Sequence, residues 1–154
     1  MRLSRTDSSD QNFLSLVELL DADLALRDGE DHAFYSQYNG VDQIRYAVVL
    51  YEGEKAIACG AIKMLFKEAM EVKRMYVIPG KRGSGIATVV LKELEKWATE
   101  LKMNRLILET GKRQPEAIGL YQKNGYSRID NFGPYVGVEN SVCFEKKLNP
   151  TVQN

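Results

Sequence analysis

Two glycines, Gly83 and Gly85, mark the part of the sequence that is best suited to bind a charged ligand. They follow Lys81 and Arg82 and precede an apolar pattern that is typical of a helix. Glycine lets a backbone approach a ligand closely. The first amides of a helix have no partner inside it, and together with the helix dipole they favour an anion. This stretch therefore predicts a site for a phosphate or pyrophosphate group.

Two known kinds of phosphate-binding loop do not fit this stretch well. A nucleotide-triphosphate P-loop has Lys and then Ser or Thr after its last glycine, whereas Ile86 and Ala87 follow Gly85. A dinucleotide-binding fingerprint is closer, with Glu109 at the end of the next predicted strand. However, Thr88 stands where that fingerprint has Gly or Ala for close helix packing. The first interpretation fails, and the second rests on a weak match.

The elements on either side of the loop are predicted by residue type and spacing. Residues 72–78 are rich in β-favouring side chains, and Pro79 ends the run. Between residues 86 and 101, apolar side chains recur at three- and four-residue steps, as in an amphipathic helix. The loop therefore joins the end of a strand to the start of a long helix.

The rest of the chain predicts further strands and helices. Asp7 to Asp10 offers caps for a helix carrying the apolar residues between Phe13 and Leu20. Other helices are expected at 33–38 and from Pro115 to near Gly125. Strands are expected over 2–6, 46–51, 55–66, 105–110, 127–132 and 141–148, with a possible bulge at Gly60. This order predicts an α/β (α+β) fold, a mixed sheet flanked by helices.

Length and composition limit the class of protein. The 154 residues predict one domain, 1–148, with a loose polar tail at 149–154. Lys plus Arg and Asp plus Glu number 21 each, so there is no basic field for nucleic acid or an anionic membrane. We expect no signal peptide and no membrane span. Cys59 and Cys143 are expected to be reduced core residues of a cytoplasmic protein, and a single histidine, His32, predicts no histidine-rich metal site.

Beyond its physical chemistry, the loop resembles a family signature. Arg82–Ala87 fits the Arg/Gln-x-x-Gly-x-Gly/Ala pattern of the GCN5-related N-acetyltransferases. Further along, Gln114–Tyr126 is similar to the second signature of that family, usually Asn-x-x-Ala-x-x-Leu-Tyr ending in Gly-Phe or Gly-Tyr. Two signatures at compatible spacing are far more specific than either alone. The resemblance covers the second half of the chain closely and the first half by element order.

The resemblance implies a fold and a cofactor. The sheet would be mainly antiparallel with two splayed parallel strands at its centre, here those ending at Val77 and Thr110. Acetyl-CoA would bind between them, its pantetheine arm pairing like an extra strand with the backbone of residues 75–77. A backbone N–H there would face the developing oxyanion. The cofactor-binding residues implied are Met75, Tyr76, Val77, Arg82, Gly83, Ser84, Gly85, Ile86, Ala87, Gln114 and Tyr121.

The resemblance also implies catalytic roles for three side chains. Glu71 matches the general base of the histone-acetylating members, and Glu109 on the neighbouring strand is a second candidate, with a water chain as a third. Strand alternation predicts one shared face for Glu71, Lys73, Met75 and Val77. Tyr121 stands at the position of the usual general acid, and a phenol with a pKa of about 10 can return a proton to a leaving thiol. Purely structural roles remain open for all three.

Other residues near the signatures have two possible roles each. Four cations would either contact the nucleotide phosphates or be solvated surface charges: Lys81, Arg82, Lys112 and Arg113. Gln114 keeps the amide of the family's usual Asn and adds a methylene. Tyr135 would line the acceptor pocket or pack on the sheet edge. The acidic segment 21–31 is either a solvated helix end or a rim that attracts a cationic amine.

The function implied is N-acetylation by direct attack of a primary amine on acetyl-CoA within a ternary complex. A small-molecule amine is the expected acceptor, because it suits the compact chain and the acidic segment. The alternatives are a protein lysine or N-terminus as acceptor, and a non-catalytic acyl-CoA-binding module. A homodimer is possible, and no nucleic-acid, membrane or metal partner is expected.

Overall fold

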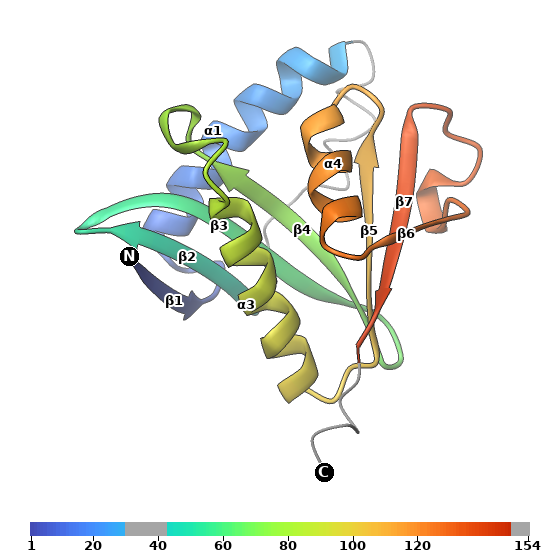
Figure 1. Cartoon of the computed structure of the whole chain (residues 1–154), viewed down its shortest axis with the longest axis horizontal. Helices are drawn as coiled ribbons and strands as arrows, with labels where there is room; N and C mark the ends of the chain where they lie inside the picture. The colour runs from blue at the N-terminus through green and yellow to red at the C-terminus, as the bar shows by residue number, and fades with distance from the viewer. Residues whose placement is uncertain (30–42, 149–154) are drawn as a thin grey trace.

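A seven-stranded sheet forms the centre of the protein (Figure 1). The computed structural model describes residues 1–29 and 43–148. The sheet has the order β1-β2-β3-β4-β5-β7-β6, and every neighbouring pair is antiparallel except β4 and β5. Its strands are β1 (Arg2–Thr6), β2 (Tyr46–Glu52), β3 (Lys55–Phe66), β4 (Ala69–Val77), β5 (Arg105–Gly111), β6 (Ser127–Ile129) and β7 (Ser141–Lys147). The predicted mixed, mainly antiparallel sheet is confirmed.

Helices cover both faces of this sheet. The helices α3 (Ile86–Glu100) and α4 (Pro115–Lys123) lie on one face, in front of the sheet in Figure 1, and pack into the larger apolar cluster. The helix α1 (Gln11–Asp28) packs on the opposite face through a second cluster. Short 3-10 turns follow β4 at Pro79–Lys81 and precede β7 at Gly133–Tyr135. Among the described residues, no helix combines the length and apolar character needed to cross a membrane.

Local sequence explains where α1 begins and which face it buries. The Asp10 carboxylate caps the helix by accepting a hydrogen bond from the Phe13 backbone N–H at 2.9 Å. Apolar side chains then recur at helical steps and are buried against β2, β3 and β4: Phe13, Leu16, Val17 and Leu20. The helix continues to Asp28 and so ends within the acidic segment 21–31, where a helix end was one of the two alternatives. The helix expected at 33–38, His32 and the tail at 149–154 lie outside the described residues.

An extra residue in β4 changes which side chains face each helix. Between Cys59 and Ala61 of β3, the partner in β4 moves from Tyr76 to Lys73, three residues against two. This is the pattern of a β-bulge. Arg74 lies at the bulge with a φ of 60°, a left-handed conformation that is uncommon for a residue other than glycine.

The bulge corrects two predictions. Glu71 and Lys73 face α1, but Met75 and Val77 pack against the α3 cluster, so the predicted shared face of these four residues is wrong. Simple alternation fails because the inserted residue moves the side chains that follow it to the opposite face of the sheet. The bulge predicted at Gly60 lies instead in β4, opposite that glycine. A Cβ on Gly60 would collide with the Met75 side chain, so the glycine makes room for the bulged strand.

The two central parallel strands pair only at their beginnings. Three residues of β4, Ala69 to Glu71, are in register with Arg105 to Ile107 of β5, and the pairing then stops. The strands diverge beyond this point, as Figure 1 shows. Within residues 1–29 and 43–148, the edges of β4 and β5 that face each other therefore have no strand partner over their remaining length. The predicted splayed pair is confirmed.

Candidate active site

A cavity of about 500 Å³ opens where β4 and β5 separate. Its walls come from five elements: the second half of β4, the loop before α3, the end of β5, α4 and the inner side of α1. Of the predicted cofactor-binding residues, all line this cavity except Ser84. The Ser84 hydroxyl donates a hydrogen bond to the Lys81 carbonyl at 3.0 Å and thereby holds the loop closed on itself.

The glycine loop has the geometry of an anion site. Gly83 and Gly85 both have a φ of 81°, in the left-handed region that favours glycine. A Cβ at either position would meet no atom within 4 Å, so the space beside the loop is open. Gly85 is also the N-cap of α3, and its carbonyl accepts a hydrogen bond from the Val89 N–H at 3.2 Å. The N–H groups of the first turn thus have no intrahelical acceptor and are available to a bound phosphate.

Arg82 folds back over the end of β4. Its Nε donates to the Val77 carbonyl at 2.8 Å, and its guanidinium lies 5.3 Å from the centre of the Tyr76 ring. The adjacent Lys81 forms an ion pair with Glu52 at 2.6 Å. Both cations are at the cavity, but Lys112 and Arg113 are exposed and do not line it. Of the four predicted phosphate cations, only the two that precede the glycines therefore line the cavity, and Lys123 of α4 lines it as well.

The two candidate bases lie on the same face of the sheet. Glu71 pairs with Ile107, and Glu109 follows Ile107 by two residues, so both carboxylates lie on the face toward α1. Glu71 is 9% exposed, and burial raises its pKa, although the charge of Lys73, whose Nζ is 3.9 Å away, opposes this effect. Burial lowers the pKa of Lys73 in turn. Desolvation thus brings the Glu71 carboxylate closer to the proton affinity that a general base needs at neutral pH.

Tyr121 is held in the inner face of α4. Its ring packs edge-on against Tyr126, with centroids 5.5 Å apart, and against Phe144 at 6.4 Å. Burial raises the pKa of the Tyr121 phenol, and the charge of Glu109 raises it further. The hydroxyl therefore stays protonated at neutral pH and can act as a donor in the cavity.

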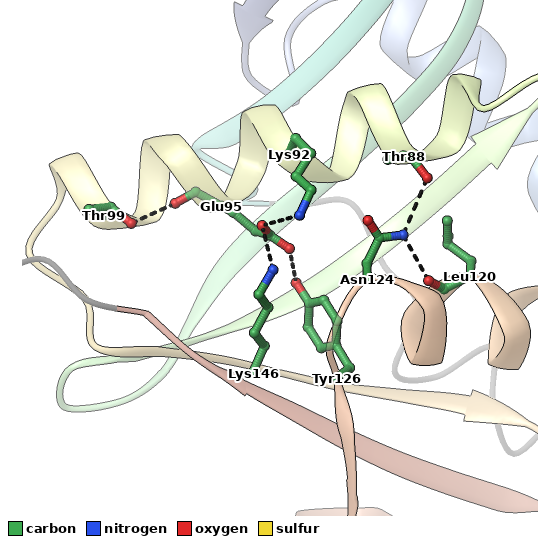
Figure 2. Close-up of polar contacts among 8 residues, drawn as sticks. All are labelled: Thr88, Lys92, Glu95, Thr99, Leu120, Asn124, Tyr126 and Lys146. Carbon is green, nitrogen blue, oxygen red and sulfur yellow. Dashed lines mark hydrogen bonds and ion pairs between the residues drawn. The ribbon is translucent and has the colours of Figure 1, made fainter.

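A buried polar network fixes α3 against α4 and β7 (Figure 2). The carboxylate of Glu95 accepts a hydrogen bond from the Tyr126 hydroxyl at 2.9 Å and forms an ion pair with Lys146 at 3.0 Å. Nearer the phosphate loop, Asn124 at the end of α4 donates to the Thr88 hydroxyl at 3.2 Å. These contacts tie the helix that starts at the loop to the helix that carries the candidate acid.

The α1 side of the cavity was not predicted from the sequence. Leu20 and Leu24 supply an apolar wall, and Arg27 forms an ion pair with Glu116 of α4, so that α1 and α4 are joined across the cavity. Two of the acidic residues in the part of segment 21–31 that the structure describes are held in ion pairs. Asp21 pairs with Arg74 at 2.5 Å, and Asp23 pairs with Arg27 at 3.3 Å.

Tyr135 has features of both roles that the sequence left open for it. It is buried, packs against Phe132 with ring centroids 5.7 Å apart, and also lines the cavity. Gln114 lines the cavity as the N-cap of α4, and its amide makes no capping hydrogen bond to that helix.

The residues present fit a coenzyme A thioester. An open glycine loop at a helix N-terminus suits a pyrophosphate, and the unpaired edge of β4 suits the amides of a pantetheine arm. The cavity is continuous from the loop to Glu71 and Tyr121, so one extended molecule can touch all three. A thioester bound there would supply an activated acyl carbon, and the chain would supply the groups around it.

Comparison with known proteins identifies the family. The sequence pattern of the Acetyltransferase (GNAT) family matches residues 13–126, and the chain belongs to this family. An IAA acetyltransferase from Azospirillum brasilense is 38% identical over 106 residues, which are 68% of this chain and 69% of that protein. The protein is therefore an N-acetyltransferase that uses acetyl-CoA as acyl donor.

Solved structures show the same fold. A Klebsiella pneumoniae protein assigned as an acyl-CoA N-acyltransferase superposes with a TM-score of 0.80 at 30% identity, covering 96% of this chain and 97% of that one. The PaiA N-acetyltransferase from Thermoplasma acidophilum, in complex with coenzyme A, superposes with a TM-score of 0.70 at 16% identity, covering 96% and 99%. The fold that the resemblance implied is thus confirmed over the described chain.

Proposed function

We propose that the protein acetylates the primary amine of a small molecule by direct attack within a ternary complex. One observation carries this proposal: Glu71, Glu109 and Tyr121 line a single cavity at the point where β4 and β5 stop pairing. Acetyl-CoA supplies the acyl thioester. The chain must then bind it, accept a proton from the amine, stabilise the oxyanion and donate a proton to the leaving sulfur.

Glu71 is the proposed general base. Its buried carboxylate has a raised pKa and faces the same side of the sheet as the α1 wall of the cavity, where an acceptor amine would enter. Deprotonation leaves the amine free to form the new N–C bond as the C–S bond breaks. The amine proton goes to the Glu71 carboxylate, directly or through one water. Glu109 lies beside this path and adds negative charge that attracts a cationic amine.

Tyr121 is the proposed general acid. The protonated phenol donates its proton to the sulfur as the C–S bond breaks. The same apolar surroundings that raise the pKa of the phenol also raise that of a thiol, so the match between donor and acceptor is maintained inside the cavity. Beyond Glu71, the backbone N–H groups of β4 that point away from β3 face a strand that has moved away, which leaves them for the acyl oxygen and the pantetheine amides.

The cysteines support direct attack and argue against an acyl-cysteine route. Neither Cys59 nor Cys143 lines the cavity, and both are buried. Burial raises the pKa of Cys59 to about 12 and that of Cys143 to about 11. A thiol with such a pKa is almost wholly protonated at neutral pH and is a poor nucleophile.

The enclosed acceptor side of the cavity supports a small molecule as acceptor. Leu20 and Leu24 wall it on the α1 side, and the Arg27–Glu116 ion pair joins α1 to α4 beside it. The name of the Azospirillum relative, IAA acetyltransferase, also fits a small-molecule acceptor. A protein lysine or N-terminus would have to pass this barrier.

An acceptor screen tests the proposal. Release of CoA would be followed with amino acids, polyamines, aminoglycosides and peptides as acceptors at fixed acetyl-CoA. We expect turnover with one small-molecule class, and double-reciprocal plots at several acetyl-CoA concentrations that intersect. Parallel lines would indicate an acyl-enzyme route, and turnover with peptides alone would contradict a small-molecule acceptor.

A further inference from the structure

Arg74 is a buried cation in the cavity wall with no role in the acetyl transfer described above. It lies at the bulge of β4, in the left-handed backbone conformation, and its side chain is 2% exposed. Non-glycine residues in such conformations persist where the surrounding structure holds them, and they cluster at ligand sites. The bulge places Arg74 on the α1 side, next to Lys73 and three residues along β4 from Glu71.

The described residues do not fill the hydrogen-bond capacity of Arg74. Its Nη2 donates to the Asp21 carboxylate at 2.5 Å, but its Nε is buried with no hydrogen-bond partner among the described residues. Asp21 is 51% exposed, so solvent screens the charge that it offers. A guanidinium has five donors, and burying it without matching acceptors is unfavourable. The site therefore favours an additional anionic acceptor, which has to displace the half-exposed Asp21 side chain because the guanidinium has almost no open surface of its own.

The distribution of charge in the cavity indicates where that anion would belong. The glycine loop suits a phosphate, and Arg74 lies in the cavity wall further back along β4, between Glu71 and residues 75–77. Glu71 and Glu109 are acidic and suit the amine of an acceptor, whereas Arg74 suits a carboxylate. Three residues of extended strand span at most about 10 Å, so a short molecule can reach both Glu71 and Arg74.

We propose that Arg74 binds the carboxylate of the acceptor, and that the acceptor is therefore an amino acid. This inference rests on the proposed acetylation of a small-molecule amine and names its substrate class. The apolar wall of Leu20 and Leu24 lies on the same side of the cavity and suits an apolar side chain. The guanidinium fork fixes the carboxylate, and the amine is thereby directed to Glu71.

Matched pairs of acceptors test this assignment. Leucine and 3-methylbutylamine, or phenylalanine and 2-phenylethylamine, differ by the carboxylate alone. Wild-type protein should acetylate the amino acid with a kcat/KM at least about 10-fold above that of the amine. In Arg74→Gln, loss of a charged hydrogen bond should lower kcat/KM for the amino acid about 10- to 100-fold, mainly through KM, and leave the amine nearly unchanged.

Control variants separate binding from a structural role. Asp21→Asn removes the ion pair with α1 but leaves Arg74 in place, and the preference for the amino acid should persist. Arg74→Lys should keep part of the preference. If Arg74→Gln lowers kcat/KM for both acceptors by the same factor, Arg74 merely joins β4 to α1 and the inference is wrong.

Two further outcomes distinguish this inference from the proposed function. If wild-type protein acetylates amines with no preference for the carboxylate, the amino-acid assignment alone fails. If no small-molecule amine of either kind is acetylated, the proposed function itself fails. Product inhibition of the wild type needs no variant: N-acetyl-leucine should inhibit more strongly than N-acetyl-3-methylbutylamine, and equal inhibition would contradict the role of Arg74.

Discussion

Glu71 and Glu109 face the same side of the sheet from the two strands that separate at its centre. The register pair Glu71 and Ile107 is the last one between β4 and β5, so Glu71 marks the point of divergence and Glu109 lies just beyond it. The charges of both carboxylates act on Lys73: they raise its pKa and so oppose burial, which lowers it. An amine entering from the α1 side would meet Glu71 at the fork between the strands.

Glu71→Gln should lower kcat/KM about 10²- to 10⁴-fold near neutral pH, because it removes the proton acceptor. Burial raises the pKa of Glu71, so in wild type the carboxylate gains a proton, and activity falls, as the pH drops through a value above the ordinary 4.5. The variant should lose this acidic limb. The measurement is kcat/KM for the amine against pH at saturating acetyl-CoA.

Glu109→Gln is the matched control on the neighbouring strand. It should retain the acidic limb and show a smaller defect, and neither change should alter the affinity for acetyl-CoA measured by calorimetry. If Glu109→Gln removes the limb and Glu71→Gln keeps it, the base has been assigned to the wrong strand.

Gly85→Val should weaken acetyl-CoA binding at least about 10-fold. An added Cβ meets no atom of the described residues within 4 Å, so the new side chain starts in the open space where a pyrophosphate would approach. The left-handed φ of 81° adds a conformational cost of about 1–2 kcal/mol. Calorimetric titration with acetyl-CoA measures the affinity, and circular dichroism checks the fold.

Gly53→Val provides the control for backbone strain. Gly53 lies in the turn between β2 and β3, has a φ of 62° and also has no atom within 4 Å of an added Cβ. The strain is comparable, but the cavity is elsewhere. Equal loss of affinity in the two variants would mean that strain, not obstruction of the loop, weakens binding.

Local patterns predicted the elements well because each depends on a few neighbouring residues. The β-favouring run ended by Pro79, and the helical spacing from Ile86, are visible in single windows of sequence, and β4 and α3 follow them closely. The signatures then identified the loop and Tyr121, and of these residues all but Ser84 line the cavity.

The acceptor side was not predictable in the same way. The position of Arg74 depends on a bulge that is set by the register between β3 and β4, which no local window encodes. Its partner Asp21 is 53 residues away on α1, and the sequence alone presents that aspartate as part of an acidic run. The sequence did indicate an irregularity near this point, because it predicted a bulge at Gly60. The extra residue lies on the opposite strand, in β4.

Tyr126→Phe should lower the free energy of unfolding by about 1.5–3 kcal/mol, because it removes a buried hydrogen bond to a charged group, Glu95. Tyr51→Phe is the control. Its hydroxyl accepts a hydrogen bond from the neutral Asn12 amide at 3.0 Å in a part-buried site, so its loss should cost about 0.5–1.5 kcal/mol. Urea unfolding at pH 7 measures both. Equal losses would show that the charge of Glu95 adds no stability beyond that of a neutral hydrogen bond.

Tyr121→Phe should bind acetyl-CoA nearly normally and turn over about 10²- to 10⁴-fold more slowly, because the ring and its packing remain and only the proton donor is lost. The defect should shrink with an acyl donor whose thiol has a lower pKa, since that leaving group needs less protonation. Tyr126→Phe tests specificity, because that hydroxyl is turned toward Glu95 and should not affect the leaving sulfur. The measurement is kcat for each variant across a series of acyl thioesters, with acetyl-CoA affinity determined separately. A defect that is equal for all donors would make Tyr121 a positioning residue, and no defect would leave it as a packed core tyrosine.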